Sequence, residues 1–190
     1  MIRIAPLALA VGAAMAAVFP VTALAQVDVE KIVQDARQAD LEGRPAFGGL
    51  SEVGDLRRDW SVNTFYVVYR GAPPEQTVFW AVRRETGTRM ARTATVWADS
   101  RSCPGVRTML LAMEQLPAVR PDAIRLGEEA SAEIQLHGSR VTFWNRWARS
   151  GPENAAVDVE IVGNVNSPAA RWWAESSPGL ADCWTPNPPA

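Results

Sequence analysis

The sequence predicts an α+β domain in which an antiparallel sheet of about five or six strands carries two or three helices on one face, with one disulfide bond. Three observations predict it. Runs of β-branched and aromatic residues alternate with turn residues through the middle of the chain. Other stretches carry apolar residues at helical spacing. Two cysteines, Cys103 and Cys183, form an even pair.

Residues 1–25 have the features of a secretory signal peptide. Arg3 gives a positive start, residues 4–18 carry no charge, and Ala23-Leu24-Ala25 matches the small-x-small pattern of signal peptidase. We predict cleavage after Ala25. The alternative is a retained N-terminal anchor, but the apolar stretch is short for a bilayer core about 30 Å thick.

Cleavage would leave one α+β domain over residues 26–185 and a flexible tail over 186–190. We therefore expect a periplasmic or secreted protein with no stable membrane insertion after the signal is removed. In such an oxidising compartment a Cys103–Cys183 disulfide is the expected state. The bridge would close a long loop, which stabilises the fold by about 4 kcal/mol. The alternative, a reactive thiol, lacks a histidine or lysine nearby in the sequence.

Composition argues against several classes of function. The 190 residues include 19 Lys+Arg and 21 Asp+Glu, giving a formal net charge of -2, which disfavours nucleic-acid binding through phosphate neutralisation. One histidine and two cysteines are too few for a closed zinc or iron–sulfur site. No phosphate-cradling glycine motif is present in the sequence. We expect no cofactor and no metal.

Periodicity and turn residues place the elements along the chain. Asp28 is expected to cap a first helix over 29–42, followed by a loop rich in glycine (Gly48, Gly49, Gly54). The other predicted elements are strands over 63–70, 77–85, 89–98 and 157–161, a helix that begins at Pro104 and ends before Pro117, and a helix over 168–175.

Gly138-Ser139 is predicted to be the type II′ turn of a hairpin that pairs 131–137 with 140–148. This register assigns an apolar and a polar face, because neighbouring residues in a strand point to opposite sides. The apolar face consists of Ile134, Leu136, Val141, Phe143 and Trp147. The polar face consists of Glu133, Gln135, His137, Arg140, Thr142, Trp144 and Arg146.

Trp144 on this polar face is the candidate binding residue, with Arg146, Gln135 and Glu133 beside or opposite it. An exposed indole next to an arginine and an amide can stack on a sugar ring, an aromatic side chain or a cation. The alternative is that another element covers this face, or that Arg146 merely lies over Trp144.

Four arginines around one turn (Arg83, Arg84, Arg89 and Arg92) are a second candidate site, since guanidinium groups bind carboxylates and phosphates bidentately. The alternative is a solvated turn with Glu85 close by.

Catalytic patterns are weak. His137 lies near Ser139 without a third group to orient it, and Asp158 and Glu160 would lie about 7 Å apart on one strand face. The leading hypothesis is therefore a small exported binding domain without a cofactor, whose partner is an envelope protein or a glycan. The alternatives are a secreted hydrolase that uses His137 or the Asp158/Glu160 pair, and a structural protein of the cell envelope.

Overall fold

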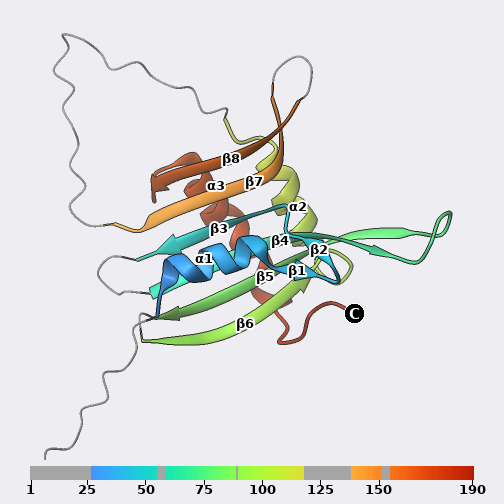
Figure 1. Ribbon diagram of the computed structural model, residues 1–190, viewed down its shortest axis with the longest axis horizontal. Helices are drawn as coiled ribbons and strands as arrows, with labels where there is room; N and C mark the ends of the chain where they lie inside the picture. Colours follow the sequence, from blue (N-terminus) through green and yellow to red (C-terminus); the bar gives the residue numbers. More distant parts are fainter. Residues whose placement is uncertain (1–26, 55–58, 89, 118–137, 151–154) are drawn as a thin grey trace, which may run out of the picture.

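The computed structural model describes residues 27–54, 59–88, 90–117, 138–150 and 155–190 and confirms the α+β architecture (Figure 1). Within these residues a six-stranded antiparallel sheet has the order β6-β5-β4-β3-β7-β8. Its strands are β3 (Gly48–Val53), β4 (Asp59–Arg70), β5 (Thr77–Thr88), β6 (Ala91–Asp99), β7 (Arg140–Ser150) and β8 (Ala155–Asn164). The other elements are the short strands β1 (Asp40–Leu41) and β2 (Arg44–Pro45), the helices α1 (Val29–Gln38), α2 (Pro104–Met113) and α3 (Pro168–Ser176), and the 3₁₀ helix η1 (Ser177–Cys183).

The helices cover both faces of the sheet rather than one. Helices α2 and α3 pack on one face as expected, whereas α1 lies on the opposite face (Figure 1). Strand β4 shows the division, because Phe65 belongs to the core beneath α2 and α3 while Trp60 and Val62 belong to the core beneath α1. Because β4 is buried on both faces, its sequence shows little alternation between apolar and polar residues.

The larger core lies between the sheet and the pair α2–α3. Trp172 of α3 meets Phe65 edge to face, with ring centroids 6.0 Å apart. Its indole Nε1 donates a hydrogen bond of 3.0 Å to the carbonyl of Met109 in α2. A buried tryptophan usually finds such an acceptor, and this contact fixes α3 against α2 as well as filling the core.

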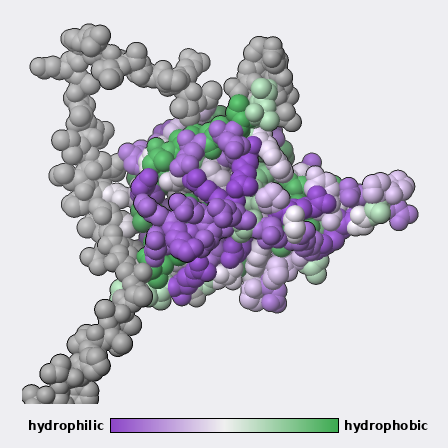
Figure 2. Space-filling view, in the orientation of Figure 1, coloured by the Kyte–Doolittle hydropathy of each residue, from purple (hydrophilic) through white to green (hydrophobic). Residues whose placement is uncertain are grey.

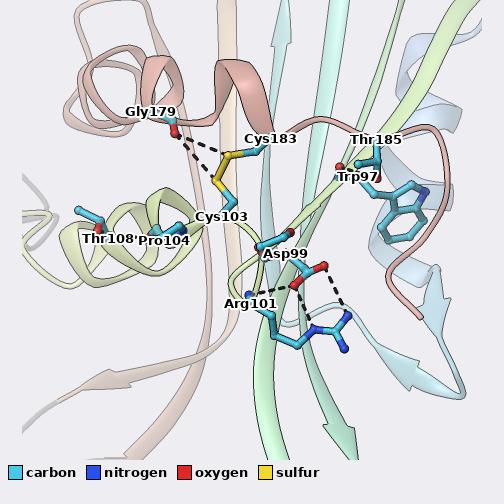
Figure 3. Close-up of a disulfide and its surroundings, with 10 residues drawn as sticks. Trp97, Asp99, Arg101, Cys103, Pro104, Thr108, Gly179, Cys183 and Thr185 are labelled. Carbon is cyan, nitrogen blue, oxygen red and sulfur yellow. Dashed lines mark hydrogen bonds and ion pairs between the residues drawn. A yellow bond between two sulfur atoms is a disulfide. The ribbon is translucent and has the colours of Figure 1, made fainter.

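The predicted disulfide is present between Cys103 and Cys183, whose Cα atoms are 5.7 Å apart. It joins the residue that precedes α2 to the last residue of η1 (Figure 3). The two segments approach so closely that a Cβ on Gly105 would overlap the carbonyl oxygen of Gly179. The bridge therefore holds the C-terminal segment on α2.

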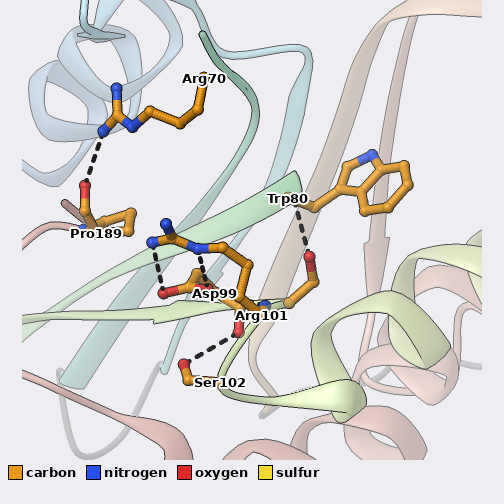
Figure 4. A network of polar contacts seen from close by, with 7 residues as sticks. Arg70, Trp80, Asp99, Arg101, Ser102 and Pro189 are labelled. Atoms are coloured by element: carbon orange, nitrogen blue, oxygen red, sulfur yellow. Dashed lines mark hydrogen bonds and ion pairs between the residues drawn. The ribbon is translucent and has the colours of Figure 1, made fainter. Parts of the chain in front are cut away.

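Polar contacts fasten the turn that follows β6 and the end of the chain (Figure 4). Asp99 accepts a hydrogen bond of 3.1 Å from the Nε of Arg101, and the hydroxyl of Ser100 accepts one of 3.0 Å from the backbone of Trp80. Near the C-terminus, the carbonyl of Pro189 accepts a hydrogen bond of 3.4 Å from Arg70.

Two sequence-based expectations about the sheet are wrong. The segment expected to be a glycine-rich loop contains β3, a central strand paired with β4 and β7. The prediction of a hairpin at Gly138-Ser139 is also wrong. Over residues 140–145, β7 pairs with β3 on one side and with β8 on the other, which leaves no side for a further strand. The predicted signal peptide lies outside the described residues, and no described helix is long and apolar enough to cross a membrane.

Candidate functional site

Helix α1 is placed on the sheet by its cap and by one apolar stripe. As expected, the carboxylate of Asp28 caps the helix, accepting a hydrogen bond of 3.0 Å from the backbone N–H of Lys31. Ile32 and Ala36 are buried against aromatic and aliphatic side chains of the sheet. Because Ile32 and Ala36 face the sheet, the side of the helix next to them, which includes Val33, is only half-buried.

A cleft of about 710 Å³ separates this flank of α1 from strands β3, β7 and β8, and we refer to it as the α1 cleft. Its volume lies in the range typical of ligand sites. Its helix wall consists of Val27, Asp28, Val29, Glu30, Val33, Gln34 and Arg37. Its sheet wall consists of Ser51, Val53, Arg140, Thr142 and Glu160. The lining thus combines aliphatic groups, hydroxyls and charges of both signs.

The charged groups of the α1 cleft face one another across it. Arg37 on α1 donates a hydrogen bond of 2.7 Å from Nη1 to the carboxylate of Glu160 on β8. This hydrogen bond, opposed by partial burial and aided by the charge of Arg37, lowers the pKa of Glu160 from its usual 4.5. Nearer the mouth, Nη1 of Arg140 lies 4.0 Å from the carboxylate of the exposed Glu30. Around the helix, the surface over α1 is hydrophilic (Figure 2).

Glu160→Gln tests the contribution of the Arg37–Glu160 pair. A carboxyl whose pKa is lowered on folding stabilises the protein above its unfolded pKa, and this contribution is lost as the pH falls through the folded pKa. The Glu160 side chain is 48% exposed, so we expect a loss of less than about 1 kcal/mol at pH 7 and no difference from wild type in strong acid. Urea unfolding at both pH values measures this. An equal loss at both would contradict the ion-pair explanation.

Trp144 is buried, and the expectation of an exposed indole is wrong. Its exposed fraction is 4%, because α1 covers it. The indole lies directly on β3, where a Cβ on Gly49 would overlap Cζ2 of Trp144. Above it, the guanidinium carbon of Arg37 is 5.1 Å from the ring centroid. Trp144 therefore lies beneath α1 and beneath Arg37, which lines the α1 cleft, in agreement with the alternative that another element covers this face.

The other residues proposed around Trp144 have different positions. Arg146 is half-buried, and its Nη2 donates a hydrogen bond of 2.6 Å to the carbonyl of Arg37 in the last turn of α1. It thereby fastens the helix that forms the cleft. Thr142, from the same predicted face, lines the cleft itself. Glu133 and Gln135 lie outside the described residues.

The cluster of arginines on β5 and β6 neutralises a buried carboxylate. Arg83 Nη1 lies 2.9 Å and Arg92 Nη1 3.4 Å from the two carboxylate oxygens of Glu85, which is 3% exposed. Arg84 points to the opposite face of the sheet, 5.6 Å from the Trp184 ring, where burial lowers its pKa. Arg89 lies outside the described residues. Glu85 is therefore close to two of these arginines, as the alternative expected, but the group is a buried ion-pair cluster on two strands and not a solvated turn.

Of the residues proposed for catalysis, Asp158 and Glu160 are described, and they share one face of β8 without the properties of an acid–base pair. Asp158 is exposed on the edge strand β8, and the lowered pKa of Glu160 is the opposite of what a general acid requires. His137 lies outside the described residues. In the part of the chain that the structure describes, no three His, Cys, Asp or Glu side chains gather as metal ligands.

Sequence reasoning missed the helix wall of the α1 cleft. In the sequence, Val29, Ile32, Val33 and Ala36 recur at helical spacing, a pattern that indicates a single apolar face for the first helix. In the structure Ile32 and Ala36 are buried, while Val29 and Val33 line the cleft. The signal that could have indicated this is the width of the stripe together with Arg37 one turn after Val33.

In comparisons with known proteins, no family model, no curated protein and no solved structure matches this chain.

Proposed function

We propose that the protein is a binding domain of the cell envelope, without a cofactor, that receives a segment of a partner protein in the α1 cleft. The observation that carries this proposal is the lining of the cleft, in which aliphatic side chains alternate with hydroxyls and with charges of both signs. Export agrees with the disulfide, since such bonds persist in oxidising compartments.

The lining favours a polypeptide over a glycan. Sugar rings are commonly bound by stacking on an exposed aromatic face. Among the described residues that line the α1 cleft none is aromatic, and Trp144 is covered by α1 and Arg37. Four valines can instead contact aliphatic side chains of a peptide, while Ser51 and Thr142 offer hydroxyls to its backbone.

The walls of the cleft are held in place before any ligand arrives. Asp28 caps the start of α1, and Arg146 binds the carbonyl of Arg37 near its end. The Arg37–Glu160 hydrogen bond joins the helix to β8. A site that is already ordered loses less conformational entropy on binding, so a short peptide segment can bind with useful affinity.

Gln34 and Gln38 provide a matched pair of positions for the test. Both are exposed residues of α1, one turn apart, but only Gln34 lines the cleft. A random dodecapeptide library displayed on phage is selected on the purified protein, and the selected peptides are synthesised. We expect Gln34→Trp to weaken their binding by about tenfold or more, which is about 1.4 kcal/mol, because the indole fills the cleft.

Gln38→Trp is the control and should leave the dissociation constants unchanged. Circular dichroism confirms that both variants are folded. Equal weakening by the two substitutions, or none by Gln34→Trp, would contradict a site in the α1 cleft. Failure to select any peptide, together with binding to a glycan array, would contradict the choice of a polypeptide ligand.

A further inference from the structure

The two edges of the sheet differ in how they are protected. At the β6 edge, the backbone N–H and carbonyl of Trp97 form hydrogen bonds of 2.7 and 2.8 Å with the backbone of Thr185, so the C-terminal segment covers part of that strand. At the other edge, β8 pairs with β7 on its inner side. Within the described residues no strand pairs with its outer side. An edge strand presents unpaired N–H and carbonyl groups that can pair with another chain.

Strand β8 lacks several of the usual obstacles to such pairing. Its ten residues include no proline and no lysine, and the irregularity in the β7–β8 ladder falls on β7, between Asn145 and Ala148. One face of β8 carries the half-buried aliphatic residues Val157, Val159 and Ile161, and Ile161 packs against the core beneath α3. An added strand could continue this apolar face.

The opposite face of β8 carries two acidic residues, Asp158 and Glu160. A second copy of this chain could pair its β8 with this β8 in an antiparallel arrangement. Two registers then pair most of the strand and keep like faces on the same side of the sheet. In one of them Glu160 lies opposite Asp158 of the other copy, and in the other it lies opposite Glu160 of the other copy. Like charges directly opposite each other destabilise a sheet. The acidic face therefore disfavours a second copy of this chain and favours a strand that carries cations at the facing positions.

We propose that the outer edge of β8 accepts an extended segment of a partner protein in which cationic and aliphatic residues alternate. Backbone hydrogen bonds would add this segment to the sheet, and the side chains would give specificity. Cations would face Asp158 and Glu160, and aliphatic side chains would face Val157, Val159 and Ile161. The proposed edge site shares Glu160 with the α1 cleft, where Arg37 already pairs with it, but the added strand would lie beyond β8 and outside the cleft.

A designed peptide tests the proposal directly. The peptide TVKVKVT is added to ¹⁵N-labelled protein and compared with the charge-reversed TVEVEVT and with TKKVVVT, which has the same composition without alternation. We expect TVKVKVT to shift the amide signals of Ala155–Asn164 and to slow their hydrogen exchange, and the two other peptides to bind at least about tenfold more weakly.

Asp158→Lys should reduce the preference, weakening TVKVKVT and strengthening TVEVEVT, because the introduced lysine and Glu160 would then carry opposite charges. Asp182→Lys, which adds the same charge at an exposed position of η1, should leave both affinities unchanged. No shift in β8 with TVKVKVT, or equal binding of the three peptides, would overturn the proposal. Concentration-dependent dimerisation through β8 would contradict the choice of a cationic partner over a second copy of this chain. Gln34→Trp should not alter this binding, which separates it from the α1 cleft.

Discussion

Trp144→Ala is expected to lower the free energy of unfolding by about 3 to 5 kcal/mol, the range for truncating a buried aromatic side chain. The indole is 4% exposed and contacts α1 on one side and β3 on the other. Alanine would leave a cavity beneath α1, and neither Gly49 nor Ala36 has a side chain large enough to fill it. Urea unfolding with the disulfide intact measures the loss.

Trp147→Ala is the matched control, since Trp147 belongs to the same strand and is 56% exposed. Its ring stacks on Phe47, with centroids 6.5 Å apart, so we expect a loss of no more than about 1 kcal/mol. If the two alanine variants lost similar stability, or if Trp144→Ala were nearly neutral, the placement of Trp144 beneath α1 would be wrong.

Removal of the disulfide is expected to be comparably severe. Cys103 and Cys183 are 80 residues apart in the sequence, and the chain-entropy estimate for a loop of this length is about 4 kcal/mol. The double variant Cys103→Ala/Cys183→Ala also frees the C-terminal segment, because η1 carries Leu180 into the core beside α2. Urea unfolding of this variant should show a lower midpoint than wild type.

Reduction of the wild-type protein should reproduce the effect of the double variant. A reducing agent should have no further effect on the double variant, because it has no bond left to cleave. An unchanged midpoint in either experiment would contradict a stabilising bridge. Two free thiols in the native protein under oxidising conditions would contradict the bond itself.

Local sequence patterns predicted most of the helices and strands and the two cysteines of the disulfide bond. The Asp28 cap, the β-branched runs of β4 and β5 and the proline at the start of α2 are signals carried by neighbouring residues, and each element is present there. The first helix ends at Gln38 and not at Glu42, because Asp40–Leu41 pairs with β2. The alternation over the first part of β7 was also assigned correctly, with Val141 and Phe143 on one face and Trp144 on the other. Trp147, expected on the apolar face, is instead 56% exposed, beyond the irregularity that follows Asn145.

Errors arose where distant packing overrides local preference. Gly48 and Gly49 suggest a loop because glycine weakens a strand, yet β3 lies in the middle of the sheet. Gly49 fits there because Trp144 lies on its backbone, a contact between residues almost a hundred positions apart. The turn residues Gly138-Ser139 suggest a hairpin, but the partners of β7 are β3 and β8.

The candidate site was less accessible to sequence reasoning for the same reason. The polar face of β7 was identified, and Thr142 and Arg140 from it line the α1 cleft. Whether a polar strand face is solvated or covered depends on where a helix more than a hundred residues earlier packs. Placement of α1 over Trp144 buries the residue expected to bind and creates the cleft beside it.

The position of a selected peptide on the protein is the most direct test of the α1 cleft. Amide chemical shifts of ¹⁵N-labelled protein are recorded with and without a peptide selected on it. We predict that the largest changes fall on the α1 residues Val29 and Val33 and on the facing residues Ser51 and Thr142. Changes confined to the opposite side of the sheet, around α2 and η1, would contradict the account.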